Sequence, residues 1–205
     1  MTITLNLHDL EKAQKTLACA FFNYPFPSLS IAEPRRMRCL EILFRLEMEY
    51  LIKRGTVEAD SAECGGVVVW STIGAAGSGA PAVSLIRRLF GKMKISEMIN
   101  LAKNSSAVEK GRKSLNLPDD TLYLYAIGVL PEMQGRGIAS KLIQEKLSEC
   151  AKQTVYLETN TEHNCRFYQK LGFELILKTY YQKNDLTTWY LVKYPELQPF
   201  HSKKD

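Results

Sequence analysis

A glycine-containing turn between an apolar run and an amphipathic run is the clearest chemical signal in the sequence. It reads Gln134-Gly-Arg-Gly-Ile-Ala139 and leads into a segment whose apolar residues recur at helical spacing. Glycine permits close backbone approach to a ligand. The free amides at a helix start attract anions, and Arg136 adds a positive charge beside them. The pattern predicts a phosphate-binding loop.

One class of phosphate-binding protein with such a turn is the dinucleotide-binding fold. Gly135 and Gly137 match the first two glycines of its Gly-x-Gly-x-x-Gly pattern, and Glu158 ends the next expected strand. Three features disfavour this alternative. Ser140 stands at the third glycine position, the turn starts too far beyond the strand ending at Val129, and too few strand–helix units follow.

A second class fits residue by residue. Residues 134–139 match Gln/Arg-x-x-Gly-x-Gly/Ala, and the sequence resembles at this point the pyrophosphate loop of the GNAT acyl-CoA-dependent N-acetyltransferases. Downstream, Asn164-Cys-Arg-Phe-Tyr-Gln-Lys-Leu-Gly-Phe173 resembles that family's Asn…Tyr-x-Lys-x-Gly-Phe segment with a shortened spacing. The resemblance is strongest over residues 121–194. It implies direct transfer of an acetyl group from acetyl-CoA, as co-substrate, to a primary amine, without a metal or a covalent enzyme intermediate.

The resemblance also implies a role for each matched residue. Backbone groups of Ile127 and Val129 would bind the pantetheine arm, and Asn164 would hydrogen-bond the same arm. The pyrophosphate would lie on the loop residues Gln134, Gly135, Arg136, Gly137, Ile138 and Ala139. Tyr168 lies four residues after Asn164, on the same helix face. Its phenol is protonated at neutral pH, so it could serve as general acid toward the departing thiolate.

The general base is less clear from the sequence. Glu158 is the best candidate because its strand should end near the thioester, Glu132 is a weaker one, and a chain of waters is a further alternative. Glu158 could equally be an ordinary exposed carboxylate. Tyr123 and Tyr125 alternate with apolar residues, so they could line an acceptor pocket or pack in the core.

The main alternative from another class is a non-catalytic acyl-CoA-binding sensor or structural module on the same fold. Cys165 follows Asn164, but a lone cysteine without an orienting base is not expected to be a nucleophile. As partners we expect a small-molecule amine or a protein amine, and neither nucleic acid nor membrane. The oligomeric state could be monomer or homodimer.

The elements that must position these residues suggest an α/β (α+β) fold. We expect a mixed, mostly antiparallel sheet of six or seven strands with helices on both faces, in a single domain over residues 1–205. A helical insertion is expected at about residues 74–117, with a flexible turn at 74–81, and it could lie over the acceptor side. Further expectations are a helix after Asp9, capped by that residue, and a loop over residues 23–30.

Composition agrees with this fold. The chain has 205 residues, 45% hydrophobic and 24% charged, with a net charge of +5, as expected for an ordinary globular domain. The five cysteines form no Cys-x-x-Cys pair, which argues against a disulfide framework or a metal site. The first residues lack the pattern of a secretory signal. A cytoplasmic location is therefore expected.

Overall fold

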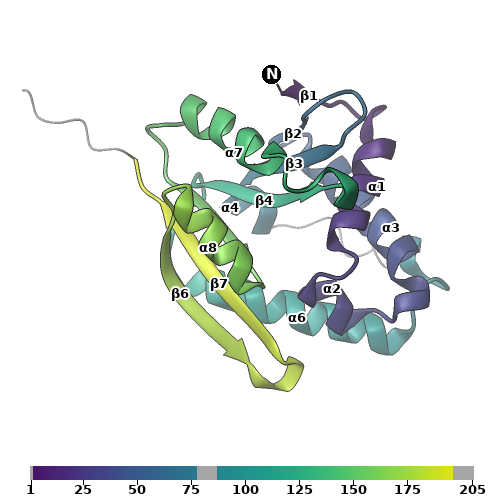
Figure 1. Ribbon diagram of the computed structural model, residues 1–205. Helices are drawn as coiled ribbons and strands as arrows, with labels where there is room; N and C mark the ends of the chain where they lie inside the picture. Colours follow the sequence, from purple (N-terminus) through teal and green to yellow (C-terminus); the bar gives the residue numbers. More distant parts are fainter. Residues whose placement is uncertain (1, 78–86, 196–205) are drawn as a thin grey trace, which may run out of the picture.

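A seven-stranded sheet organises the chain, with the spatial order β1-β2-β3-β4-β5-β7-β6. The computed structural model describes residues 2–77 and 87–195. Every neighbouring pair is antiparallel except β4 and β5. The expected mixed, mostly antiparallel fold is confirmed (Figure 1), and the dinucleotide-binding alternative, which needs a parallel sheet, is wrong. The strands are β1 (Ile3–Thr4), β2 (Thr56–Ala59), β3 (Gly66–Thr72), β4 (Leu122–Val129), β5 (Val155–Thr159), β6 (Glu174–Tyr181) and β7 (Leu186–Lys193).

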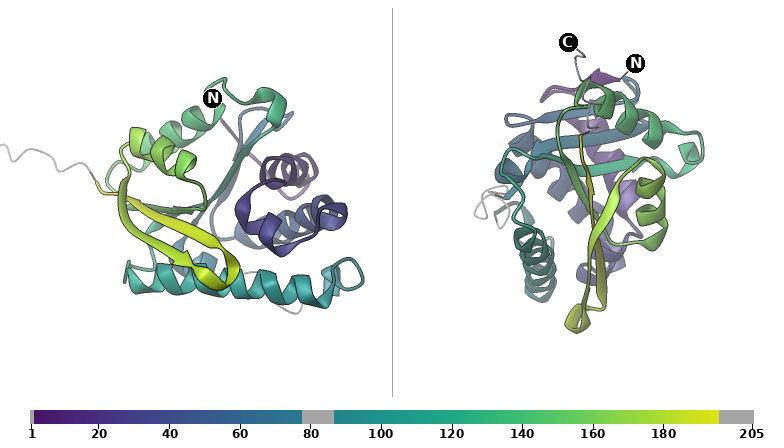
Figure 2. Two further views of the ribbon diagram at one scale, coloured as in Figure 1. Left: turned by 60° about the horizontal axis from the view of Figure 1, so that its bottom comes forward. Right: turned by 90° about the vertical axis from the view of Figure 1, so that its left-hand side faces the viewer.

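Helices cover both faces of the sheet, as Figure 2 shows. They are α1 (Leu10–Phe21), α2 (Pro25–Ser30), α3 (Glu33–Leu51), α4 (Ile73–Gly77), α6 (Ile95–Ser114), α7 (Ile138–Glu149) and α8 (Glu162–Lys170). Val67 and Val69 of β3 pack with α1 and α3. Val68 and Trp70, pointing the other way, pack with α7 and α8. Within the described residues, no helix is long and apolar enough to cross a membrane.

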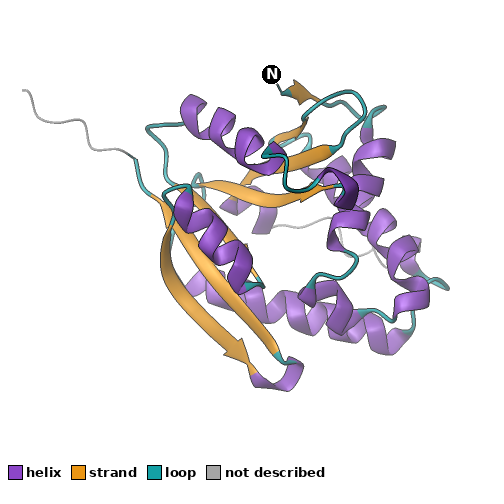
Figure 3. Ribbon diagram, viewed as in Figure 1, coloured by secondary structure: helices purple, strands orange, loops and turns teal. Residues whose placement is uncertain are grey.

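Three local expectations are wrong. Residues 25–30 form the short helix α2 rather than a loop (Figure 3), because proline fits a first helical turn. Residues 73–77 form α4 instead of the start of a flexible turn, while residues 78–81 lie outside the described part. Asp9 has helical backbone angles and does not cap α1. Its carboxylate accepts from the Asn6 amide at 3.1 Å instead.

The parallel pair at the centre of the sheet separates soon after it forms. Only Leu122↔Val155 and Tyr123↔Tyr156 are in register. On its other edge, β4 shifts register against β3, because Val69 faces Ala126 and Trp70 faces Leu124, which leaves Tyr125 as a bulge. A bulge bends its strand. The second half of β4 and the end of β5 therefore lie apart, each bonded only to its outer neighbour.

The described part of the segment expected to be an insertion contains one long helix, α6, after a left-handed turn at Gly91 (φ 73°). Its first turn is held by the buried carboxylate of Glu97, which accepts from the Ala32 and Lys94 amides at 2.9 and 2.8 Å. That carboxylate also pairs with Arg35 at 2.7 Å. In the middle, the buried Asn104 amide donates to Ser30 Oγ of α2 at 2.9 Å. The helix is thus fixed by polar contacts along its length.

Candidate active site

The loop between β4 and α7 has the geometry expected of an anion site. Gly135 and Gly137 have φ values of 77° and 76°, which explains why glycine is present at both positions. Gly137 is the N-terminal boundary residue of α7, and no side chain caps the helix. A Cβ atom built at Gly135 or Gly137 would meet nothing within 4 Å. The loop surface is therefore open, and the first amides of α7 are free to bind an anion.

Side chains within the loop brace its backbone. The Gln134 amide donates to the Val129 carbonyl at 3.1 Å, and Arg136 donates to the Glu132 carbonyl at 3.2 Å. Arg136 remains exposed, so its charge adds to the positive end of the α7 dipole. The Val129 carbonyl, expected to face a ligand, is engaged by Gln134. Ile127 lies on the part of β4 that has no partner in β5.

Tyr168 and Asn164 lie on α8, whose start is capped by Thr161 through a 3.2 Å bond from the Asn164 amide. Tyr168 is buried between Phe167 and Phe173, with ring centroids 5.2 and 6.0 Å away. Burial, with a contribution from Tyr24, raises the pKa of Tyr168, and its hydroxyl has no hydrogen-bond partner among the described residues. The phenol is thus protonated and available to donate.

Tyr24 is a candidate site residue that sequence reasoning missed. It lies in the segment between α1 and α2, and its hydroxyl contacts Thr159 Oγ1 at 2.7 Å and accepts from the Asn160 amide at 2.6 Å. The side chain of Asn164 helps to lower the pKa of this phenol, although burial raises it overall. Tyr24 therefore connects the end of β5 to the residues of α8.

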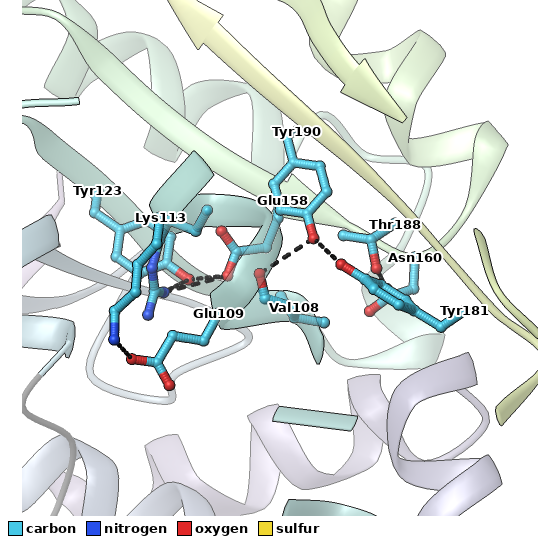
Figure 4. Close-up of polar contacts among 10 residues, drawn as sticks. Val108, Glu109, Lys113, Tyr123, Glu158, Asn160, Tyr181, Thr188 and Tyr190 are labelled. Carbon is cyan, nitrogen blue, oxygen red and sulfur yellow. Dashed lines mark hydrogen bonds and ion pairs between the residues drawn. The ribbon is translucent and has the colours of Figure 1, made fainter. Parts of the chain in front are cut away.

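Glu158 lies in a buried polar cluster under α6 (Figure 4). Its Oε1 accepts from the Tyr123 hydroxyl at 2.5 Å and lies 3.5 Å from Arg112 Nη1. The side chains of Arg112 and Glu158 are 12% and 14% exposed, so the alternative of an ordinary exposed carboxylate is wrong. Burial raises the pKa of Glu158, whereas Arg112, Tyr123 and Tyr156 act to lower it.

Two polar atoms in this cluster are buried without a hydrogen bond: Oε2 of Glu158 and the hydroxyl of Tyr156. Buried polar groups are normally satisfied, so the free Oε2 marks a place for a donor. Tyr123 is almost fully buried and Tyr125 is half-buried. The ring of Tyr123 therefore packs in the core, and its hydroxyl donates a hydrogen bond to Glu158.

Glu158 and Tyr168 lie on opposite faces of the sheet. Tyr168 shares a hydrophobic cluster with Leu157, and the neighbouring Glu158 points the other way, as strand alternation requires. Glu132, the weaker base candidate, is exposed in the loop before α7. Cys165 is buried, and burial raises the pKa of its thiol, which disfavours a nucleophilic thiolate.

Comparison with known proteins finds one family model that matches part of the chain. Residues 101–175 match the model described as "Acetyltransferase (GNAT) domain". The match covers 75 of the 205 residues, so this part of the chain is similar to GNAT acetyltransferases. The matched range contains the loop at 134–139 as well as Glu158, Asn164 and Tyr168.

Solved structures share the fold across nearly the whole chain. A protein of Corynebacterium glutamicum described as histone acetyltransferase HPA2 and related acetyltransferase is similar with a TM-score of 0.70 at 21% identity, covering 97% of this chain and 98% of that one. Polyamine N-acetyltransferase of Drosophila melanogaster, which forms N-acetylagmatine, is similar with a TM-score of 0.64 at 16% identity. The similarity covers 95% of this chain and 99% of that one. Arylalkylamine N-acetyltransferase 2 of Aedes aegypti is similar with a TM-score of 0.57 at 13% identity, and the similarity covers 95% of this chain and 98% of that one.

Proposed function

We propose that this protein transfers an acetyl group from acetyl-CoA to a primary amine, with Tyr168 as general acid and Glu158 as general base. The observation that carries the proposal is the open loop at the uncapped start of α7, next to the place where β4 and β5 separate. A phosphate-bearing ligand fits that loop, and its extended arm fits between the strands. When bound, acetyl-CoA supplies an activated acetyl thioester.

The protein's own groups divide the binding work. Amides of residues 134–139 bind the phosphates, assisted by Arg136. Backbone groups of β4 near Ile127 and Val129 bind the pantetheine arm, with the Asn164 side chain on the opposite side. Since the Val129 carbonyl already accepts from Gln134, Ile127 is the stronger backbone candidate of the two.

Proton transfer then takes place on both sides of the sheet. Tyr168 gives a proton to the sulfur as the carbon–sulfur bond breaks. An amine that enters as a cation first gives one proton to solvent, because only the neutral amine can attack. Glu158 then accepts, at Oε2, the second proton, which the nitrogen loses as it bonds to the acetyl carbon. Transfer of a proton from Glu158 to the Tyr168 phenolate through solvent restores both groups. Both groups are buried, and a buried site makes such hydrogen bonds electrostatically stronger than they are in water.

The acceptor proposed is a small cationic amine. The similar structures include enzymes named for polyamine, agmatine and arylalkylamine acetylation. A buried carboxylate with one unpaired oxygen suits an ammonium group. A protein amine would have to reach the same carboxylate under α6.

The first test is binding, measured as a thermal shift with acetyl-CoA, CoA, NAD and ATP. A ligand at 100 times its dissociation constant adds about 2.7 kcal/mol of stability, or roughly 5–11 °C for a domain of this size. Acetyl-CoA and CoA should stabilise the protein, and NAD should not. Release of CoA is then followed with agmatine, spermidine, tyramine and a short peptide as acceptors.

The variant Tyr168→Phe tests the acid. We expect unchanged acetyl-CoA affinity and a kcat reduced roughly 100-fold or more, because general acid catalysis contributes factors of about this size. Tyr180→Phe, which alters a 59% exposed tyrosine, is the matched control and should behave as wild type. Normal turnover by Tyr168→Phe would remove Tyr168 from the mechanism. Tight acetyl-CoA binding with no turnover on any amine would favour the non-catalytic binding module.

A further inference from the structure

The motifs that resemble those of GNAT acetyltransferases leave the C-terminal part of α6 unexplained. This stretch holds Arg112, a nearly buried cation, and it packs against the sheet face opposite to α7 and α8. Figure 4 shows the residues around it, from α6, β4, β5 and β7.

Gly111 allows α6 to approach the sheet closely. A Cβ atom at this position would lie 2.1 Å from the Tyr190 hydroxyl oxygen and 2.9 Å from that of Tyr181. The Tyr190 hydroxyl donates to the Val108 carbonyl at 3.1 Å and contacts the Tyr181 hydroxyl at 2.7 Å. These bonds hold the helix against β7 and β6 at the turn that contains Arg112.

Arg112 is thereby placed beside Glu158. Its Nη1 lies 3.5 Å from Glu158 Oε1 and 3.4 Å from the Tyr123 hydroxyl, and the guanidinium stands 5.4 Å from the centre of the Tyr123 ring. Both partners bind the same carboxylate oxygen, and Oε2 has no hydrogen bond of good geometry among the described residues, although the Tyr156 hydroxyl lies near enough to help lower the pKa of Glu158. Arg112 and Tyr123 thus fix the orientation of the Glu158 carboxylate through Oε1 and leave Oε2 available to a further donor.

The other groups around Glu158 are phenols. Tyr123 comes from β4, Tyr156 from β5 itself and Tyr190 from β7. Burial raises the pKa of each, so they are neutral. Within residues 2–77 and 87–195, Arg112 is the cation in ion-pair contact with Glu158.

We propose that Arg112 is a positioning residue, which keeps the Glu158 carboxylate ionised and turned so that Oε2 can take the proton of the acceptor amine. The inference rests on the proposed role of Glu158 as base. Without the guanidinium, a carboxyl in this buried place takes up a proton from solvent at higher pH. Once protonated, the Glu158 carboxyl could not accept a second proton from the amine near neutral pH.

The test compares Arg112→Met and Arg112→Lys with Lys113→Met as matched control, because Lys113 is the adjacent cation, 74% exposed, and pairs only with Glu109 among the described residues. Protein labelled with ¹³C at glutamate carboxyls is titrated by NMR, and the Glu158 signal is assigned from Glu158→Gln. We expect Arg112→Met to raise the Glu158 midpoint by at least one pH unit, in keeping with the effect of a nearby opposite charge. Arg112→Lys should remain close to wild type, and Lys113→Met should match it.

Activity supplies the second readout. The acid limb of the kcat/KM profile should move upward in Arg112→Met by the same amount as the NMR midpoint, with the KM for acetyl-CoA unchanged. An unchanged midpoint overturns the proposal. So does a shifted midpoint with an unmoved acid limb, since Glu158 would then not be the proton acceptor. Failure of the proposed function is visible separately, as wild-type protein that binds no acetyl-CoA in the same samples. If Arg112→Met does not fold, Arg112→Gln, which removes the charge but keeps a hydrogen-bond donor, is measured instead, with the same expected and overturning results.

Discussion

Gly111→Ala tests whether α6 packs on the sheet as closely as the structure shows. In an exposed helix, replacing glycine by alanine stabilises by about 1 kcal/mol. Here the added methyl would lie 2.1 Å from Tyr190 Oη and 2.4 Å from Tyr190 Cζ. The Tyr190 side chain is fully buried, so it has little space to move away. Overpacking costs about 1–3 kcal/mol, and the disturbed Tyr190 hydrogen bonds add about 1 kcal/mol each.

The net expectation for Gly111→Ala is a loss of roughly 2–4 kcal/mol, after the helix-propensity gain is subtracted. This corresponds to a fall in Tm of roughly 4–16 °C for a domain of this length. Urea denaturation with intact m-values measures the loss directly. Ser106→Ala, at an exposed position of the same helix, is the control and should change stability by less than about 0.5 kcal/mol. A Gly111→Ala protein as stable as wild type, or more stable, would refute the close contact between α6 and Tyr190.

Two further predictions concern other parts of the site and its support. Arg35, together with two backbone amides, lowers the pKa of Glu97 from 4.5 to about 2. The folded pKa is the lower one, so this pair stabilises at neutral pH and its contribution is lost as pH falls from about 4.5 to about 2. Glu97→Gln should lower the free energy of unfolding, measured by urea denaturation, by roughly 1–3 kcal/mol at pH 7 and by less at pH 3. The upper value is reduced because Arg35 is 34% exposed. An equal loss at both pH values would contradict the ion pair. Gly137→Ala should lose about 1–2 kcal/mol of stability from its positive φ and weaken acetyl-CoA binding by calorimetry, whereas Gly91→Ala, with a similar φ of 73° and equally open surroundings, should show the strain with unchanged affinity.

Parts of the site that depend on short-range patterns were predictable from the sequence. Alternation and helical periodicity located the strands and helices that flank the loop. The glycines at 135 and 137 signalled a backbone conformation, and both have positive φ. The spacing of Asn164 and Tyr168 placed them on one face of a helix, which the structure contains as α8.

The surroundings of Glu158 were not predictable in the same way. Arg112 is 46 positions away in the chain, and α6 has no apolar stripe to show which face it buries. Its buried residues are Glu97, Asn104, Val108 and Gly111, most of them polar or without a side chain. Such a helix is placed by hydrogen bonds and by the ion pairs of Glu97 with Arg35 and of Arg112 with Glu158, and neither kind of contact leaves a periodic signal. Tyr24 contacts Thr159, which is 135 positions away in the chain, so this contact also leaves no pattern in the sequence.

The residues that short-range patterns predicted and the residues that only the structure revealed lie on two different sides of the candidate site. The loop, α7 and α8 lie within the segment that matches the family, and they provide the groups proposed to bind the cofactor and to protonate sulfur. The opposite face is built by α1, α2 and α6, and there Tyr24 contacts Thr159 and Arg112 contacts Glu158. The C-terminal half of α6 also lies within the matched segment. Because the proposed base Glu158 lies on that face, we expect Arg112, Tyr24 and their neighbours to decide which acceptor binds. At 13–21% identity the similar structures share the fold, and the acceptor has to be found by assay on this protein.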